Sequence, residues 1–219
     1  MIVRKSLLAV ALALATTGAY AQTATDRAGE LKVWREQCSD PDSDLRIAYI
    51  EAALETQDTS IIRICARQSL EGDDSDTRNL GLRAALASMD HIRFEVEIPP
   101  MLAEALEDAG DNEKKLNEIS KWFIARDWQV LKTGLAFDID KADLAKGTSE
   151  WFPLANLTAR NDRYTGKLSI TGDKVSWVGA AYLANSECNL TAQLVAGPAL
   201  EGEWLCARGE PFKVRADLL

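Results

Sequence analysis

The strongest constraint on the fold is a change in the spacing of apolar residues about two thirds of the way along the chain. As far as Gly134 they recur every three or four residues, which predicts amphipathic helices joined by short polar turns. From Trp151 onward apolar and polar residues alternate, which predicts strands with one buried face. The sequence therefore predicts an α+β protein in which a helical-hairpin domain precedes a small antiparallel β domain. The expected segments are a helical domain at 22–134, a charged connector at 135–150 and the β domain at 151–219.

Polar capping residues, prolines and a glycine mark the ends of six expected helices. Ser43 or Asp44 is suited to cap the second helix, because its side-chain oxygen can accept from free backbone N–H groups. Prolines suit the first turn of the fifth helix. The expected helices cover 26–38, 44 through 54, 60–70, 76 through 86, the Pro99-Pro100 pair to Gly110, and 112–132.

Two segments of the helical region resemble each other. Residues 44–58 align with residues 76–90 at an offset of 32, with six of fifteen positions identical. A period of this length is typical of α-solenoids, in which each helical hairpin buries its apolar face on the next. We expect a HEAT-like or TPR-like hairpin repeat, with a non-repetitive helical bundle as the alternative, because alanine-rich helices align easily. No resemblance to a particular family is identified.

One β-hairpin is predicted in register. If Leu194 faces Leu200 across the turn, then Cys188 faces Cys206, so alternation, register and a disulfide agree. Three further strands are expected at 167–170, 175–179 and 212–216.

Four cysteines in an exported chain predict two disulfides. Three pairings are open in principle, and proximity within each part of the chain favours Cys38 with Cys65 and Cys188 with Cys206. No CxxC spacing is present and His91 is the single histidine, so neither a zinc site nor any other metal or cofactor is expected.

The first residues have the features of a secretory signal peptide. Arg4 and Lys5 precede an apolar run from Leu7 to Ala15, and small residues precede the junction between Ala21 and Gln22. We expect residues 1–21 to be removed during export to the bacterial periplasm. The apolar run is shorter than a membrane-spanning helix, and no later uncharged run is comparable, so no membrane anchor is expected.

The chain is acidic, with a formal net charge of −9 that becomes −11 when the leader is removed. The excess lies entirely between residues 22 and 150. Such a charge repels nucleic acids and anionic membranes and favours a basic protein or a cationic ligand as the partner. Conferring solubility on an exported helical surface is the simpler explanation of the same charge.

Few residues point to catalysis. His91 titrates near neutrality, but the pattern places it at the end of a helix with no Ser or Cys nucleophile beside it. The aspartates of 138–143 resemble the start of a calcium loop, yet Asp143 and Ser149 stand where such a loop has glycine and an acid. A pair of carboxylates could serve a hydrolase, but the chain has 34 acids and their pairing depends on the fold.

Six tryptophans are candidates for core packing or for contact with a partner. Trp151 and Phe152 either seal the two domains together, which is favoured, or form an exposed binding edge. The tryptophans expected in the core are Trp34, Trp122, Trp177 and Trp204.

Together these features favour a non-catalytic periplasmic binding or adaptor protein. A narrower form of this hypothesis is an inhibitor or immunity-type protein for a basic partner. The alternative is a cell-envelope hydrolase that uses paired carboxylates.

Overall fold

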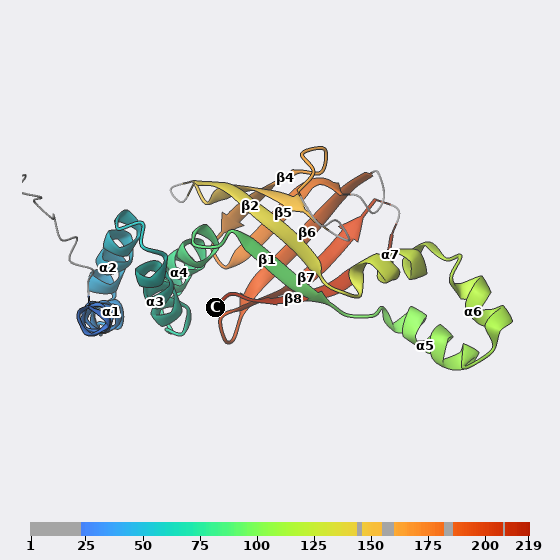
Figure 1. Cartoon of the computed structure of the whole chain (residues 1–219), viewed down its shortest axis with the longest axis horizontal. Helices are drawn as coiled ribbons and strands as arrows, with labels where there is room; N and C mark the ends of the chain where they lie inside the picture. The colour runs from blue at the N-terminus through green and yellow to red at the C-terminus, as the bar shows by residue number, and fades with distance from the viewer. Residues whose placement is uncertain (1–22, 144–145, 155–159, 182–185, 208) are drawn as a thin grey trace, which may run out of the picture.

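The computed structural model describes residues 23–143, 146–154, 160–181, 186–207 and 209–219. It contains three parts: four N-terminal helices, an antiparallel β-barrel, and a helical insert between the first two barrel strands (Figure 1). The four helices and the insert lie at opposite ends of the barrel. The leader at 1–21 and its cleavage point lie outside the described residues, so export stays a prediction.

The N-terminal helices begin at capping side chains. Asp42, Asp58 and Asp74 each accept hydrogen bonds from backbone N–H groups of the first turn that follows. The cap predicted at Ser43 or Asp44 is wrong, because both residues lie inside α2 and Asp42 precedes them. Burial alone would raise the pKa of Asp58, but the N–H of Ile61 and the Arg27 guanidinium lower it further than burial raises it. The four helices are α1 (Ala24–Cys38), α2 (Ser43–Glu55), α3 (Thr59–Leu70) and α4 (Ser75–Ala87).

These helices form two successive hairpins of similar design. Helices α2 and α4 begin 32 residues apart and each has 13 residues, in agreement with the internal similarity of the sequence. A Cβ added at Gly81 of α4 would lie 2.6 Å from the Cβ of Ser69, so glycine allows α3 and α4 to approach closely. The predicted disulfide between Cys38 and Cys65 is confirmed, and it joins the end of α1 to α3. Membership of a HEAT-like or TPR-like class stays a prediction.

The β part is a closed barrel in which each strand pairs antiparallel with the next and β8 pairs with β1. The strands are β1 (His91–Val96), β2 (Leu135–Asp143), β3 (Thr148–Pro153), β4 (Gly166–Thr171), β5 (Lys174–Ala181), β6 (Ser186–Val195), β7 (Ala199–Cys206) and β8 (Phe212–Asp217).

Two barrel strands lie where the sequence predicted other structure. Residues 91–96, expected within the helical part, form β1, and the expected connector at 135–150 contains β2 and the start of β3. Strand β1 has only six residues, and it is stabilised by pairing with β2 and β8, which are distant in sequence. Asp138 and Asp140 of β2 alternate with the buried Leu135 and Phe137, so these two acids lie on the outer face of the strand. The sequence pattern did not predict β1 because it is short and lies between helical segments. It did not predict β2 because many of its residues are charged.

Aromatic rings fill the barrel. The Phe137 ring centroid lies 5.3 Å from the centroids of both Trp151 and Trp177, and Trp177 stacks on Trp204 at 5.4 Å. The Trp177 Nε1–H donates to the Trp151 carbonyl oxygen at 3.2 Å. Such aromatic pairs add about 0.5–1.5 kcal/mol each beyond their burial. The interior of this barrel is thus a packed core.

The predicted hairpin and its disulfide are confirmed. Leu194 pairs with Leu200 and Cys188 pairs with Cys206, and the two cysteines are bonded. A Cβ at Gly202 would lie only 1.9 Å from the carbonyl oxygen of Thr191, so β6 and β7 approach unusually closely there.

The insert between β1 and β2 comprises α5 (Pro100–Ala109), α6 (Glu113–Ile119) and α7 (Phe123–Leu131). Pro99 precedes the first helix and Gly110, at a φ of 48°, ends it. The single helix expected at 112–132 is wrong, because Trp122 is extended at φ −65° and ψ 142° and interrupts it.

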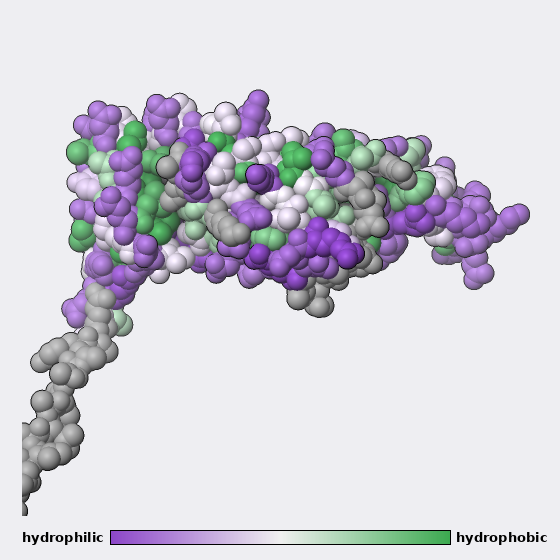
Figure 2. Space-filling model, turned by 90° about the horizontal axis from the view of Figure 1, so that it is seen from above, coloured by the Kyte–Doolittle hydropathy of each residue, from purple (hydrophilic) through white to green (hydrophobic). Residues whose placement is uncertain are grey.

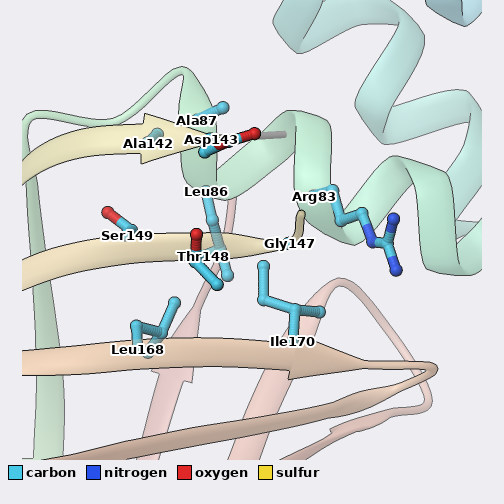
Figure 3. Close-up of a pocket in the computed structure, with 10 residues that line it drawn as sticks. All are labelled: Arg83, Leu86, Ala87, Ala142, Asp143, Gly147, Thr148, Ser149, Leu168 and Ile170. Atoms are coloured by element: carbon cyan, nitrogen blue, oxygen red, sulfur yellow. The ribbon is translucent and has the colours of Figure 1, made fainter. Parts of the chain in front are cut away.

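The N-terminal helices pack on the barrel through α4, and one apolar core is continuous across both. Figure 3 shows Arg83 and Leu86 of α4 beside Gly147 and Ile170 at the end of strands β3 and β4. The space left among these side chains is only about 10 Å³, which indicates close packing. Within the described residues, no helix has the length and apolar composition needed to cross a bilayer.

Candidate functional site

The insert contains a small apolar cleft between its three helices. The cleft has a volume of about 210 Å³ and is separate from the barrel interior. Leu102 and Ile119 form buried parts of its wall, whereas Leu106, Leu116 and Trp128 are only half-buried. Its full lining is Leu102, Leu106, Leu116, Ile119, Ser120, Ala125, Trp128 and Gln129.

Two aromatic side chains lie exposed on the segment that joins α6 to α7. Trp122 is 40% exposed and Phe123 is 64% exposed, two and three residues after Ser120 of the cleft wall. The Arg126 guanidinium lies 4.9 Å from the centre of the Phe123 ring, a cation–π contact. Met101, at the start of α5, is 47% exposed. We call Trp122 and Phe123 the aromatic pair.

The insert that contains the cleft is acidic. Residues 97–134 contain eight acids and five bases. On α5, Glu104, Glu107 and Asp108 are exposed on the helix that contributes Leu102 and Leu106 to the cleft. Among the bases, Lys121 is ion-paired with Glu118 at 2.7 Å and Lys115 donates to the main chain of Asp108. In Figure 2 the insert forms the tapered, largely hydrophilic end of the molecule at the right.

One acid of the insert is partly desolvated. Burial raises the pKa of Asp127 above its ordinary value of 3.8, and the nearby Arg126 charge offsets part of that rise. An added Cβ at Gly209 would lie 3.6 Å from Asp127 Oδ2, so this carboxylate lies next to the segment that follows β7. Asp127 of α7 therefore lies where the insert meets the barrel, and burial disfavours its charged form.

His91 lies at the start of β1, and its predicted position at a helix end is wrong. Its side chain is 72% exposed, and Nδ1 lies 2.7 Å from Oδ1 of Asp138 on the neighbouring strand. Among the described residues, no Ser or Cys side chain is hydrogen-bonded to His91 or Asp138. The pair is a surface contact between two strands.

The three aspartates between residues 138 and 143 each pair with a different basic side chain. Asp138 faces His91, Asp140 Oδ2 is 3.1 Å from Arg160, and Asp143 is 2.9 Å from Lys146. The described residues contain no group of three or more His, Cys, Asp or Glu side chains arranged to hold a metal ion.

Trp151 and Phe152 are both buried in β3, so these residues do not form an exposed edge. Trp151 points into the barrel core, and the Arg160 guanidinium lies 3.5 Å from the centre of the Phe152 ring. The contact between the helices and the barrel is instead made by α4, through Leu86 and Arg83.

Of the four tryptophans predicted in the core, the structure confirms some and not others. Trp177 and Trp204 are buried as predicted, and Trp34 is half-buried against the core. For Trp122 the prediction of a core position is wrong. The sequence contains one signal of this. Trp122 and Phe123 are adjacent between Lys121 and Arg126, and two adjacent residues of a helix do not share one buried face.

A larger hollow of about 550 Å³ lies on the outer face of strands β4 to β7. Its lining includes four hydroxyl side chains, Gly202, and Glu201 and Glu203 of β7. Arg215 is ion-paired with Glu201. The hydrolase that uses paired carboxylates stays a prediction.

No protein-family model matches this chain, and no curated protein matches it in sequence. The inference of function rests on the geometry of the described residues.

Proposed function

We propose that this chain is an exported, non-catalytic binding or adaptor protein whose insert captures an amphipathic helical segment of a basic protein. An inhibitor of a basic enzyme, or an immunity-type protein, would act in this way. The observation that carries the proposal is the apolar cleft of the insert, together with the exposed aromatic pair that lies between Ser120 and Ala125 of its lining along the chain.

The size of the cleft favours side chains of a protein as its occupant. Sites for small molecules typically have volumes of about 300–1,000 Å³, and this cleft has about 210 Å³. A few apolar side chains from one face of a helix fit a groove of this kind. Exposed Trp and Phe side chains are typical of the residues that dominate protein interfaces.

The charge of the insert favours a basic occupant over a second copy of this acidic chain. Glu104, Glu107 and Asp108 lie beside the cleft, and acidic rims accelerate association with cationic proteins. Two copies of a chain whose net charge is −11 without the leader repel each other.

Two disulfides are typical of proteins from an oxidising compartment. They support the proposed export to the periplasm, with cleavage between Ala21 and Gln22. The intact mass of the protein purified from the periplasm tests this, since it should correspond to a chain that begins at Gln22 and retains both disulfides.

The binding proposal is tested with labelled model peptides and the mature chain. The probe is a helical peptide of leucine and lysine with one apolar face, and fluorescence anisotropy measures its dissociation constant. We expect the double variant Trp122→Ala and Phe123→Ala to bind at least tenfold more weakly, because it removes the two exposed aromatic side chains of the insert. Val178→Ala is the matched control, because Val178 is 47% exposed on the barrel, outside the insert.

Three comparisons could overturn the proposal. A leucine–glutamate peptide of the same pattern should bind far more weakly, and equal binding would contradict the acidic rim. A leucine–lysine peptide with scrambled order should also bind weakly, and equal binding would contradict the cleft. Analytical ultracentrifugation is the third comparison. A dimer that dissociates in the Phe123→Ala variant would show that the insert mediates self-association instead.

A further inference from the structure

A further hollow is lined by residues of α3, of β1 and of the segment at the C-terminal end of β8. Figure 1 shows α3 and the C-terminus on the same side of the molecule. The volume of this hollow is about 330 Å³, within the range of small-molecule sites. Arg63 and Arg67, one helical turn apart on α3, line one side, and Arg93 of β1 contributes a third guanidinium. We call this hollow the arginine cleft.

The arginine cleft is lined by more basic than acidic side chains. In the part of the chain that the structure describes, neither the Arg63 nor the Arg67 side chain makes a hydrogen bond or ion pair, and both side chains are exposed. Arg93 uses Nη1 to donate to the Thr133 carbonyl oxygen at 2.8 Å. Of the lining side chains the acid is Asp217, and Arg215 lies 3.6 Å from it.

The remaining wall is apolar. Met89, Ile92 and Leu218 line the cleft beside the arginines, and Ile92 and Leu218 are buried. His91 also lines it, and its Nδ1 is held by Asp138. A ligand with an anionic head and an apolar body would match both walls.

We propose that the arginine cleft binds a small organic anion, a carboxylate or phosphate carried on a short apolar group. The guanidinium groups of Arg63 and Arg67 bind the oxyanion through paired N–H donors, whose planar geometry fits both carboxylate and phosphate. The apolar group lies against Met89 and Ile92. This site is separate from the insert and does not depend on the function proposed for it.

Four compounds of similar shape serve as probes of the mature protein in isothermal titration calorimetry: phenyl phosphate, benzoate, benzyl alcohol and benzylamine. We expect measurable binding of one or both anions and none of the alcohol or the amine. The order of phenyl phosphate and benzoate tells which oxyanion the cleft prefers. Binding of benzyl alcohol as tightly as the anions would overturn the proposal.

Variants of the arginines localise the binding. The double variant Arg63→Gln and Arg67→Gln should weaken anion binding at least tenfold, whereas Arg35→Gln, which removes an exposed arginine of α1, should leave it unchanged. The double variant to lysine keeps the charge but loses the planar donors, so it should show an intermediate loss. Circular dichroism confirms that each variant is folded. Unchanged anion binding in the glutamine variant, or equal loss in Arg35→Gln, would refute the site.

Discussion

Gly202 provides the most direct test of the close approach between β6 and β7. Replacing it by alanine would place a Cβ 1.9 Å from the Thr191 carbonyl oxygen and 2.5 Å from the Ala192 Cα. Both are main-chain atoms of the neighbouring strand, so no side chain can move aside. Ordinary contact begins near 3.4 Å, so the two strands must separate locally by about 1.5 Å, which is a large part of a normal hydrogen-bond length.

The expected cost follows from this displacement. Overpacking strain costs about 1–3 kcal/mol, and each ladder hydrogen bond that is lost costs about 1 kcal/mol more. Alternation along the ladder places the hydrogen bonds between β6 and β7 at the two pairs that flank Gly202, Thr191 with Glu203 and Gln193 with Glu201. If the local separation breaks about two of these bonds, Gly202→Ala should lower the free energy of unfolding by about 4 kcal/mol. For a chain of this length that corresponds to a fall in Tm of about 8–16 °C.

Urea unfolding followed by tryptophan fluorescence under non-reducing conditions measures the change, since Trp204 lies two residues away in the same strand. Gly29→Ala is the matched control: it lies inside α1 with no atom within 4 Å of the added Cβ. That change should stabilise the protein by about 0.5–1 kcal/mol, because alanine favours helix. A loss below about 1 kcal/mol for Gly202→Ala would refute the reasoning about strand approach.

Two further predictions concern stability. Replacing Cys188 and Cys206 together by alanine should lower the free energy of unfolding by about 3 kcal/mol, because their bond closes a loop with a sequence separation of 18; this difference should vanish when both proteins are unfolded under reducing conditions. Asp127→Asn should stabilise the protein at pH 7, because the folded state raises the pKa of Asp127 by burial and so disfavours its charged form. The gain should shrink as the pH falls through the raised pKa towards 3.8, and a gain that persists in acid, in urea titrations over this range, would contradict burial of the charge.

The sequence by itself determined the local features. The first four helices begin within one or two residues of the predicted positions, because a cap contacts only the first turn and needs no tertiary partner. The capping side chain of α2 was still misidentified, since Asp42 accepts the hydrogen bonds expected for Ser43 or Asp44. The hairpin of Cys188 and Cys206 was predictable because alternation, a short turn and a disulfide all specify the same register. Both disulfide pairs follow from proximity along the chain.

Only the tertiary structure decided where the barrel closes and where a site can form. Strand β1 has six residues between two helical regions, and it is stabilised by β2 and β8, which lie about 40 and 120 residues further along the chain. The same closure buries Trp151 inside the barrel. It leaves Trp122 and Phe123 outside on the insert, and it brings Arg63 next to Arg93. Helical periodicity shows which side chains share a face, but whether that face meets solvent depends on neighbours that the chain supplies from far away.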